Sequence, residues 1–178
     1  KPVLETLFLA FEALLKSKSK RQPLALNLPE REIQLSKKGE VQSINFKKQL
    51  SANKLIEEFM VLANICAAET LSNKKVPAIY RIHEEPSLEK INALNETIRS
   101  IDLKLKKLNS VKTADLNRIL TLASTTDHSS LINLSILRTM TQAYYSNKLS
   151  SHFGLNLQKY AHFTSPIRRY ADLIVHRA

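Results

Sequence analysis

The segment from Ser51 to about Leu71 gives the strongest helix prediction in this chain and constrains its fold more than any other feature. Apolar residues recur almost all round this predicted helix instead of along one stripe, a pattern typical of a helix buried at the centre of a domain. Polar residues interrupt the pattern, because Asn53, Glu57 and Asn64 share one face. We therefore predict a central, buried helix that carries a few polar side chains.

Glu57 and Glu58 are adjacent on this predicted helix, and a carboxylate beside buried apolar surface is costly unless it is paired or hydrogen-bonded. Two interpretations stay open. In the structural one, one of the two carboxylates pairs with an arginine such as Arg81 or Arg138 and fixes the packing of the helix. In the functional one, it faces a cleft and bonds a hydroxyl group or a base of a ligand.

The rest of the sequence predicts one α+β unit that is predominantly helical. A length of 178 residues, with 43% hydrophobic residues, is sufficient for a single domain with its own core. A small hairpin is expected where alternating apolar residues flank Lys38 and Gly39. The expected helices cover about 2–20, 87–108, 114–123 and 129–145, and the expected extended segments cover 32–35, 41–46, 78–83, 153–157 and 160–163.

The end of the chain predicts a helix whose first turn binds an anion. Ser165 suits the N-cap position, and Pro166 suits the first helical position, where a missing N–H costs nothing. Arg168 and Arg169 would then lie beside free backbone N–H groups, and phosphate is the expected anion. The alternative is a surface helix in which Asp172 neutralises Arg168 at i, i+4 spacing.

The charge balance limits the partners of the chain. Lys and Arg number 27 against 16 Asp and Glu, which gives a formal net charge of +11 and favours nucleic acid or an anionic membrane as partner. A basic surface that serves solubility is the alternative. Cys66 is the only cysteine, which fits a reducing, cytoplasmic location, and no apolar stretch approaches the roughly 20 residues of a membrane span. Two glycines argue against a glycine-rich phosphate loop.

Three blocks of this sequence resemble the ribonuclease II / ribonuclease R family, also called the RNB or VacB family. They are K-L-I-E-E-F-M-V-L-A-N at 54–64, R-I-H-E-E-P at 81–86, and Y-A-H-F-T-S-P-I-R-R-Y-A-D at 160–172. The order and separation of the blocks match as well. The resemblance covers essentially the whole chain and implies that residues 1–178 are the C-terminal portion of an RNB catalytic domain. The lack of an initiator methionine agrees with a fragment of a longer protein.

The resemblance implies an activity for the protein that carries this segment. The family consists of processive 3′→5′ exoribonucleases that hydrolyse single-stranded RNA to nucleoside 5′-monophosphates with Mg²⁺ held by clustered aspartates. The aspartates of this chain are isolated, so we expect the metal-binding half to be absent and the segment alone to bind no Mg²⁺ and to cleave nothing. We also expect the exposed apolar surface of half a domain to cause self-association.

Two further classes of function stay open beside this enzyme. One is a non-catalytic basic module that binds RNA or an acidic partner. The other is a structural or partner-binding helical domain, whose affinity for polyanions would not depend on Arg168 or Glu58.

The resemblance also assigns roles to single residues. Arg168 corresponds to the arginine that contacts the phosphate at the cleaved 3′ end, and Glu58 to an acidic residue that bonds the ribose or base of the terminal nucleotides. These two are the expected catalytic residues. The further RNA-binding residues implied are Glu57, His162, Thr164, Ser165 and Arg169.

Four more side chains complete the set of expectations. Leu26 stands where many relatives carry a phenylalanine that stacks on a terminal base, and a leucine can pack against a base without the π-stacking contribution. Tyr170 falls on the apolar face of the predicted last helix and is expected in the core. His152 and His176 are expected to be structural.

Overall fold

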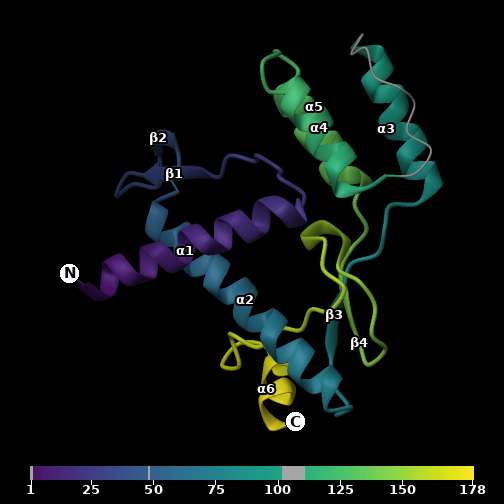
Figure 1. Cartoon of the computed structure of the whole chain (residues 1–178). Helices are drawn as coiled ribbons and strands as arrows, with labels where there is room; N and C mark the ends of the chain where they lie inside the picture. Colours follow the sequence, from purple (N-terminus) through teal and green to yellow (C-terminus); the bar gives the residue numbers. More distant parts are fainter. Residues whose placement is uncertain (1, 48, 102–110) are drawn as a thin grey trace.

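The computed structural model describes residues 2–47, 49–101 and 111–178. Helices predominate and the strands are short, so the predicted α+β class is confirmed. The elements, drawn in Figure 1, are α1 (Pro2–Arg21), β1 (Arg31–Leu35), β2 (Val41–Phe46), α2 (Ser51–Asn73), β3 (Tyr80–Ile82), α3 (Leu88–Ser100), α4 (Thr113–Ala123), α5 (Ser129–Thr139), β4 (Tyr144–Ser146), a 3₁₀ turn (Phe153–Leu155) and α6 (Tyr170–Arg177).

One hydrophobic core lies among α3, α4 and α5, which stand together at one end of the molecule (Figure 1). Leu116, Ile132 and Ile136 are fully buried there. The segment after α1 runs along this bundle and is tied to it by side-chain amides. The backbone N–H of Ala25 donates to Asn117 Oδ1 at 2.8 Å, and that of Asn27 donates to Asn133 Oδ1 at 2.8 Å.

A second core joins the C-terminal half of α2 to β3 and α6. Its buried members are Ala68, Leu71, Ala78, Tyr80, Ile82, Ala161 and Val175. The β3 strand pairs with β4 in an antiparallel ribbon, with Arg81 opposite Tyr145. This ribbon connects the helical bundle to the second core. The segment around Tyr160 then lies beside β3, where its carbonyl accepts a hydrogen bond from the N–H of Arg81.

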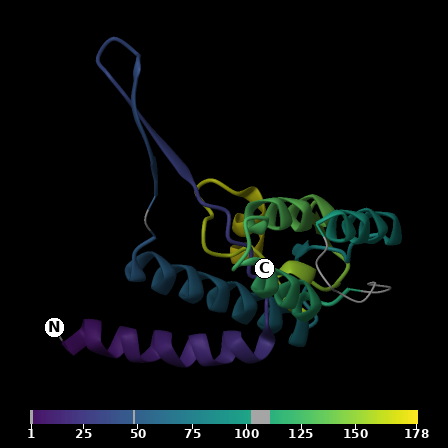
Figure 2. The ribbon, with the colours of Figure 1, turned by 90° about the horizontal axis from the view of Figure 1, so that it is seen from above.

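The β1–β2 hairpin projects from the body of the molecule as an arm (Figure 2). The predicted turn is confirmed, with Gly39 at a φ of +82°, a left-handed conformation that glycine adopts without strain. Ile33 pairs with Ile44 and Leu35 with Val41, so these apolar side chains share one face. All four are exposed, and their face has no packing partner among the described residues.

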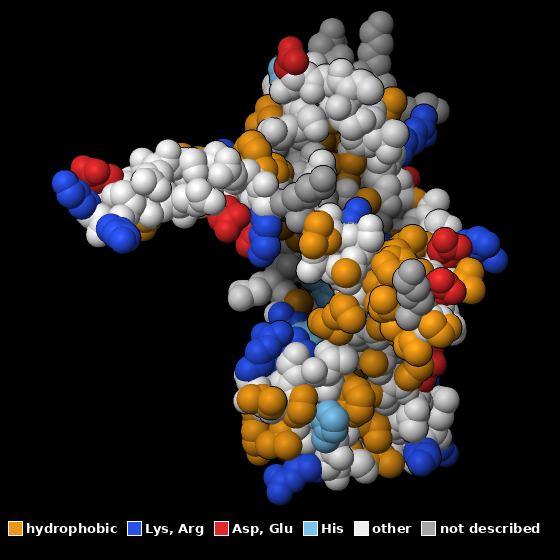
Figure 3. Space-filling view, turned by 90° about the vertical axis from the view of Figure 1, so that its left-hand side faces the viewer, with side chains coloured by type: hydrophobic (Ala, Val, Ile, Leu, Met, Phe, Trp, Pro, Cys, Tyr) orange, Lys and Arg blue, Asp and Glu red, His pale blue; other side chains and the backbone are white. Residues whose placement is uncertain are grey.

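The prediction of full burial for the 51–71 helix is wrong. Of the apolar residues on α2, Leu55, Ala68 and Leu71 are buried, whereas Ile56 is 57% exposed. The reason is that α1 and the second core cover only part of the circumference of α2. Figures 1 and 2 show α1 running alongside this helix, and Figure 3 shows hydrophobic side chains gathered over the N-terminal helix.

Two other segments differ from the predictions, and a third is confirmed over its described part. The helix expected over 129–145 ends at Thr139, because Met140 adopts an extended backbone and the following residues pair with β3 as β4. The segment expected to be extended at 153–157 contains a 3₁₀ turn, closed by a hydrogen bond from the N–H of Asn156 to the carbonyl of Phe153. The helix expected over 87–108 is confirmed at 88–100, and the rest of it lies outside the described residues.

Candidate functional site

The segment before α6 is a turn and not the predicted start of a helix. The N–H groups of Arg168 and Arg169 both donate to the carbonyl of Ser165, at 3.3 and 3.1 Å, and α6 begins at Tyr170 with Arg169 as its N-cap. Ser165 is therefore not the cap of α6, and its N–H donates to the Asp172 carboxylate at 2.8 Å, which ties the start of the turn to α6. The prediction of a core position for Tyr170 is also wrong, since its side chain is 72% exposed.

The two adjacent arginines have different surroundings. Arg169 donates from Nε and Nη2 to the two oxygens of Asp172, each at 2.8 Å, so it is Arg169 that forms the ion pair considered for Arg168. Arg168 is exposed, and among the residues described here its guanidinium has neither a hydrogen-bond acceptor nor a carboxylate partner. The turn therefore presents one unpaired cation to solvent. An exposed guanidinium without a carboxylate partner can form two parallel hydrogen bonds with a phosphate, because no ion pair has to be broken first.

His162 lies beside these arginines. Its Nδ1 is 2.7 Å from the hydroxyl of Tyr145, and the guanidinium of Arg81 lies 4.8 Å above the ring of the same tyrosine. Burial and, after it, the charge of Arg169 lower the pKa of His162 to about 4, with Arg81 and Arg168 acting in the same direction and Asp172 opposing them. The histidine is therefore neutral near pH 7, and the positive charge of this region resides on the arginines. Figure 3 shows Lys and Arg side chains beside a histidine on the face between the hairpin and the C-terminal part of the chain.

Asn64 joins α2 to the segment that carries His162. Its buried side chain donates from Nδ2 to the hydroxyl of Tyr160 at 2.9 Å and accepts from the N–H of Phe163 at 2.8 Å through Oδ1. Asn53 and Glu57, expected on the same face of the helix, are both exposed. This role of Asn64 was not predicted, although an asparagine among apolar residues of a helix indicates a buried, hydrogen-bonded side chain.

Glu58 is buried, and its carboxylate pairs with Lys18 of α1. This pairing agrees with the structural interpretation, but the partner is a lysine of the first helix and not Arg81 or Arg138. Glu58 also lines a pocket of about 220 Å³ whose other lining residues are Leu14, Ser17, Lys18, Arg21, Val61, Leu62, Ile65 and Leu157. Glu57 instead accepts a hydrogen bond from Gln49 Nε2 at 3.3 Å.

Polar side chains influence one another's pKa both near Glu58 and near the turn at residues 165–169, the arginine turn. Burial lowers the pKa of Arg21, and the nearby Glu58 carboxylate opposes that shift. Burial raises the pKa of Tyr160, while the Asn64 hydrogen bond and the charges of Arg169 and Arg21 oppose that shift. The Nε atom of Arg21 is buried and has no hydrogen-bond partner among the described residues.

The remaining predicted residues have these positions. Thr164 Oγ1 is buried without a partner in the described part of the chain, and Leu26 is half-buried against the core of the α3–α5 bundle. His152 packs edge-on against His83 and Tyr160, as expected of a structural role. His176 stacks on the Phe163 ring at 4.1 Å.

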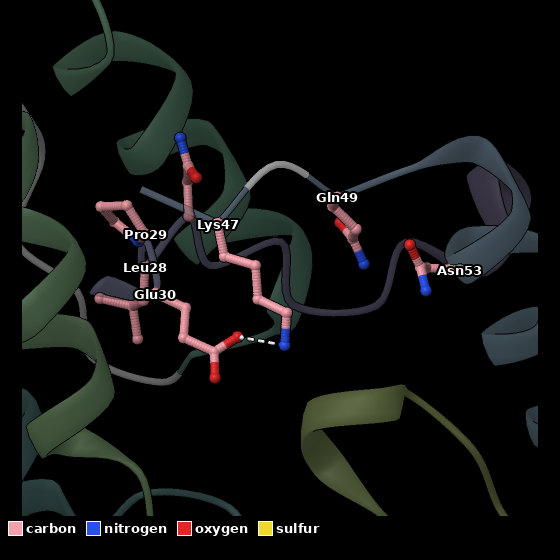
Figure 4. A pocket seen from close by; sticks show the side chains of 7 residues that line it. Leu28, Pro29, Glu30, Lys47, Gln49 and Asn53 are labelled. Carbon is pink, nitrogen blue, oxygen red and sulfur yellow. Dashed lines mark ion pairs between the residues drawn. The ribbon is translucent and has the colours of Figure 1, made fainter. Parts of the chain in front are cut away.

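Another pocket of the described residues holds none of the predicted site residues. It measures about 520 Å³ and lies at the base of the hairpin, next to the first residues of α2 (Figure 4). Its ion pair, Lys47 to Glu30 at 3.3 Å, is exposed. The other lining residues are Asn27, Leu28, Pro29, Gln49 and Asn53.

Metal ligands do not gather within residues 2–47, 49–101 and 111–178, where no group of three or more His, Cys, Asp or Glu side chains could hold an ion. Asp172 is engaged by Arg169, and Asp115 accepts from the N–H of Lys112 at the start of α4. Asp102 lies outside the described residues. These residues do not fit a magnesium site. No helix in the same ranges is both long and apolar enough to cross a membrane.

The sequence model of the RNB domain matches residues 2–178, and the chain belongs to this family. Ribonuclease R of Escherichia coli (strain K12) is 37% identical over 175 residues, which are 98% of this chain and 22% of that protein. Ribonuclease R of Thermotoga maritima is 36% identical over 167 residues, 93% of this chain and 24% of that protein. The chain thus spans less than a quarter of the length of these relatives.

Solved structures agree with this assignment. Mycoplasma genitalium RNase R, in complex with ribose methylated single-stranded RNA, matches with a TM-score of 0.88 and 32% identity over 98% of this chain and 27% of that one. Yeast Ssd1, a pseudonuclease, matches with a TM-score of 0.62 and 26% identity over 73% of this chain and 16% of that one. The family resemblance seen in the sequence is confirmed.

We expect the stability of the fold to fall as the pH drops from 6.5 towards 4. Burial lowers the pKa of both His152 and His162 from 6.5 to about 4, so the folded state holds them neutral while the unfolded chain takes up protons first. Their contribution is complete above pH 6.5 and is lost below it. Thermal unfolding at about pH 7.5 and at about pH 5 would show the lower Tm in acid.

His162→Gln should reduce this pH dependence, whereas a matched change at exposed His128 should leave it intact. Equal pH slopes for wild type and His162→Gln would contradict the prediction.

Proposed function

We propose that this chain is the RNA 3′-end-binding portion of a processive 3′→5′ exoribonuclease that hydrolyses single-stranded RNA to nucleoside 5′-monophosphates. In this proposal, residues 1–178 are the C-terminal portion of the RNB catalytic domain. The clustered aspartates that hold Mg²⁺ belong to the other portion, and the enzyme acts in the cytoplasm. The name of the relatives, ribonuclease R, and the RNA bound by the Mycoplasma genitalium protein support the choice of RNA as substrate.

The observation that carries the proposal is the unpaired Arg168 in a turn that is itself fixed. The Ser165 N–H and the Arg169 guanidinium are held by a fully buried carboxylate, so the turn has one defined shape. Arg168 is left exposed at its apex, with Arg169 and Arg81 close enough to add positive potential around neutral His162. A phosphodiester is the anion that suits such a site, because it offers two oxygens to one guanidinium.

The expected role of Arg168 is to align the last phosphodiester and to stabilise the charge that develops on it during hydrolysis. The role proposed for Glu58 is a hydrogen bond to the ribose or base of the terminal nucleotides, and it requires the Lys18 ammonium to move aside or to share the carboxylate. A 2′-hydroxyl as partner would select RNA over DNA. Glu57, His162, Thr164, Ser165 and Leu26 are proposed as further RNA contacts, and Arg169, which is held by Asp172, is proposed to add positive potential beside them.

A second candidate is a non-catalytic basic module that binds RNA. Two observations favour it. The net charge is +11, and the ion pair with Lys18 occupies the Glu58 carboxylate that the first proposal needs for substrate. Charge alone provides sequence-independent affinity for a phosphate backbone.

One assay separates the two candidates. The protein that carries this chain is incubated with Mg²⁺ and a 5′-labelled single-stranded oligoribonucleotide, and the products are resolved by length. The exoribonuclease predicts progressive shortening from the 3′ end with release of nucleoside 5′-monophosphates, while the matching oligodeoxyribonucleotide persists. RNA that is bound but stays at full length would favour the non-catalytic module, and internal cleavage would contradict both.

A further inference from the structure

Asp172 is the one carboxylate of the described residues that is completely buried, with an exposed fraction of 0%. It accepts three hydrogen bonds, each 2.8 Å long: one from the Ser165 N–H, one from Arg169 Nε and one from Arg169 Nη2. Burial by itself would raise the pKa of this carboxyl, but the hydrogen bonds from Arg169 and Ser165 hold it below its usual value. Asp172 is therefore a buried carboxylate anion, and both of its oxygens accept hydrogen bonds.

The three hydrogen bonds fix a particular piece of chain. Ser165 begins the turn and Arg169 ends it, so a single carboxylate clamps both ends, and the N–H groups of Arg168 and Arg169 complete the turn through the Ser165 carbonyl. Within this clamp, consecutive side chains diverge. Arg169 is drawn inward, with 19% of its side chain exposed, while Ile167 and Arg168 face solvent.

We propose that Asp172 is a positioning residue: by clamping Ser165 and Arg169 it holds the 165–169 turn so that Arg168, and not Arg169, is presented to the phosphate of the RNA 3′ end. The inference rests on the proposed function, in which Arg168 binds that phosphate. Asp172 itself touches no substrate. It acts through the shape of the turn and through the charge that it removes from Arg169.

The loss of the carboxylate would undo both effects. In Asp172→Asn the amide oxygen can still accept the Ser165 N–H, but the amide NH₂ faces the N–H groups of Arg169, and two donors cannot bond each other. Arg169 then keeps a partly buried charge without a counter-ion, and it is free to compete with Arg168 for the phosphate. The phosphate would be bound, but in a displaced position.

The test is a double-mutant cycle in the protein that carries this chain, with hydrolysis of a single-stranded oligoadenylate as readout. We expect Asp172→Asn to lower kcat by about 10- to 100-fold with a KM change of less than about threefold, because misplacement affects alignment more than attraction. In an Arg168→Ala background the same change should alter kcat by less than about twofold, because the residue through which Asp172 acts is absent. Asp127→Asn, at an exposed carboxylate, is the matched control and should leave kcat unchanged in both backgrounds.

Two results would overturn the inference. One is an equal loss of kcat from Asp172→Asn with and without Arg168, which a merely structural role predicts. The other is a wild-type kcat in Asp172→Asn. The oligonucleotide assay on the wild-type protein tests the proposed function by itself. With that activity present, a fully active Arg168→Ala enzyme would reject the role of Arg168, whereas an inactive one combined with a fully active Asp172→Asn would reject only the role of Asp172.

Arg169→Lys provides a second variant if Asp172→Asn does not fold, as judged by its Tm. Lysine keeps the positive charge opposite Asp172 but lacks the planar fork that makes two parallel hydrogen bonds. It should lower kcat in the wild-type background and have no further effect once Arg168 is alanine. A loss of the same size in both backgrounds would reject the positioning role.

Discussion

Under the proposed function, Arg168→Ala is expected to lower the turnover of RNA by about 10²- to 10³-fold, the loss typical of removing one preorganised group that stabilises developing charge. RNA affinity should change by less than about fivefold, because many basic residues share the attraction to the phosphate backbone. The fold should be unaffected, since the Arg168 guanidinium forms no hydrogen bond or ion pair within the described part of the chain. Single-turnover kinetics give the rate of the chemical step, and the Tm checks the fold.

Arg177→Ala is the matched control for this variant. Arg177 is also exposed, lies near the end of α6 and carries the same charge, so its removal changes the net charge equally without touching the turn. We expect near wild-type turnover from it. Equal turnover in Arg168→Ala and wild type, or an equal loss in both variants, would show that the site acts through general charge and not through one aligned guanidinium.

Asn64→Ala is expected to cost about 2–4 kcal/mol of unfolding free energy, because it leaves one buried and one partly buried group unpaired at about 1–3 kcal/mol each. These groups are the hydroxyl of Tyr160 and the N–H of Phe163. The change would loosen the junction between α2 and the segment leading to the arginine turn, so activity should fall as well. Urea-induced unfolding, with the slope m checked for constancy, measures the first effect.

Asn92→Ala provides the comparison, because Asn92 is an exposed asparagine within α3. Its replacement should change the unfolding free energy by less than about 0.5 kcal/mol. A similarly small effect at Asn64 would mean that the junction is held by packing of the second core and not by the asparagine.

Local features of the fold could be predicted from the sequence because local periodicity determines them. The helix α1, the hairpin with Gly39 at its turn, and α4 lie where apolar spacing and turn residues placed them. Predictions that depended on tertiary neighbours were wrong. The apolar circumference of α2 indicated burial, but the number of neighbours that cover a helix is not encoded in its own periodicity.

In the candidate site, too, the local sequence predicted which residues lie close together but not which of them pair. The sequence placed Arg168, Arg169 and Asp172 within reach of one another, but spacing favoured an Arg168–Asp172 pair because it assumed a helix from Pro166 onwards. A turn changes which side chains face each other, and the pair formed is Arg169–Asp172. Nor could spacing indicate that Glu58 meets Lys18, which is 40 positions away and lies on another helix.

Arg169 stabilises the fold through its ion pair with Asp172, whereas the exposed Arg168 makes no such contact among the described residues. Under the proposed function, a single codon change at position 168 would produce a protein that accumulates normally, still binds RNA and no longer degrades it. Selection for RNA turnover, and not selection against misfolding, would then be what preserves an arginine at this position.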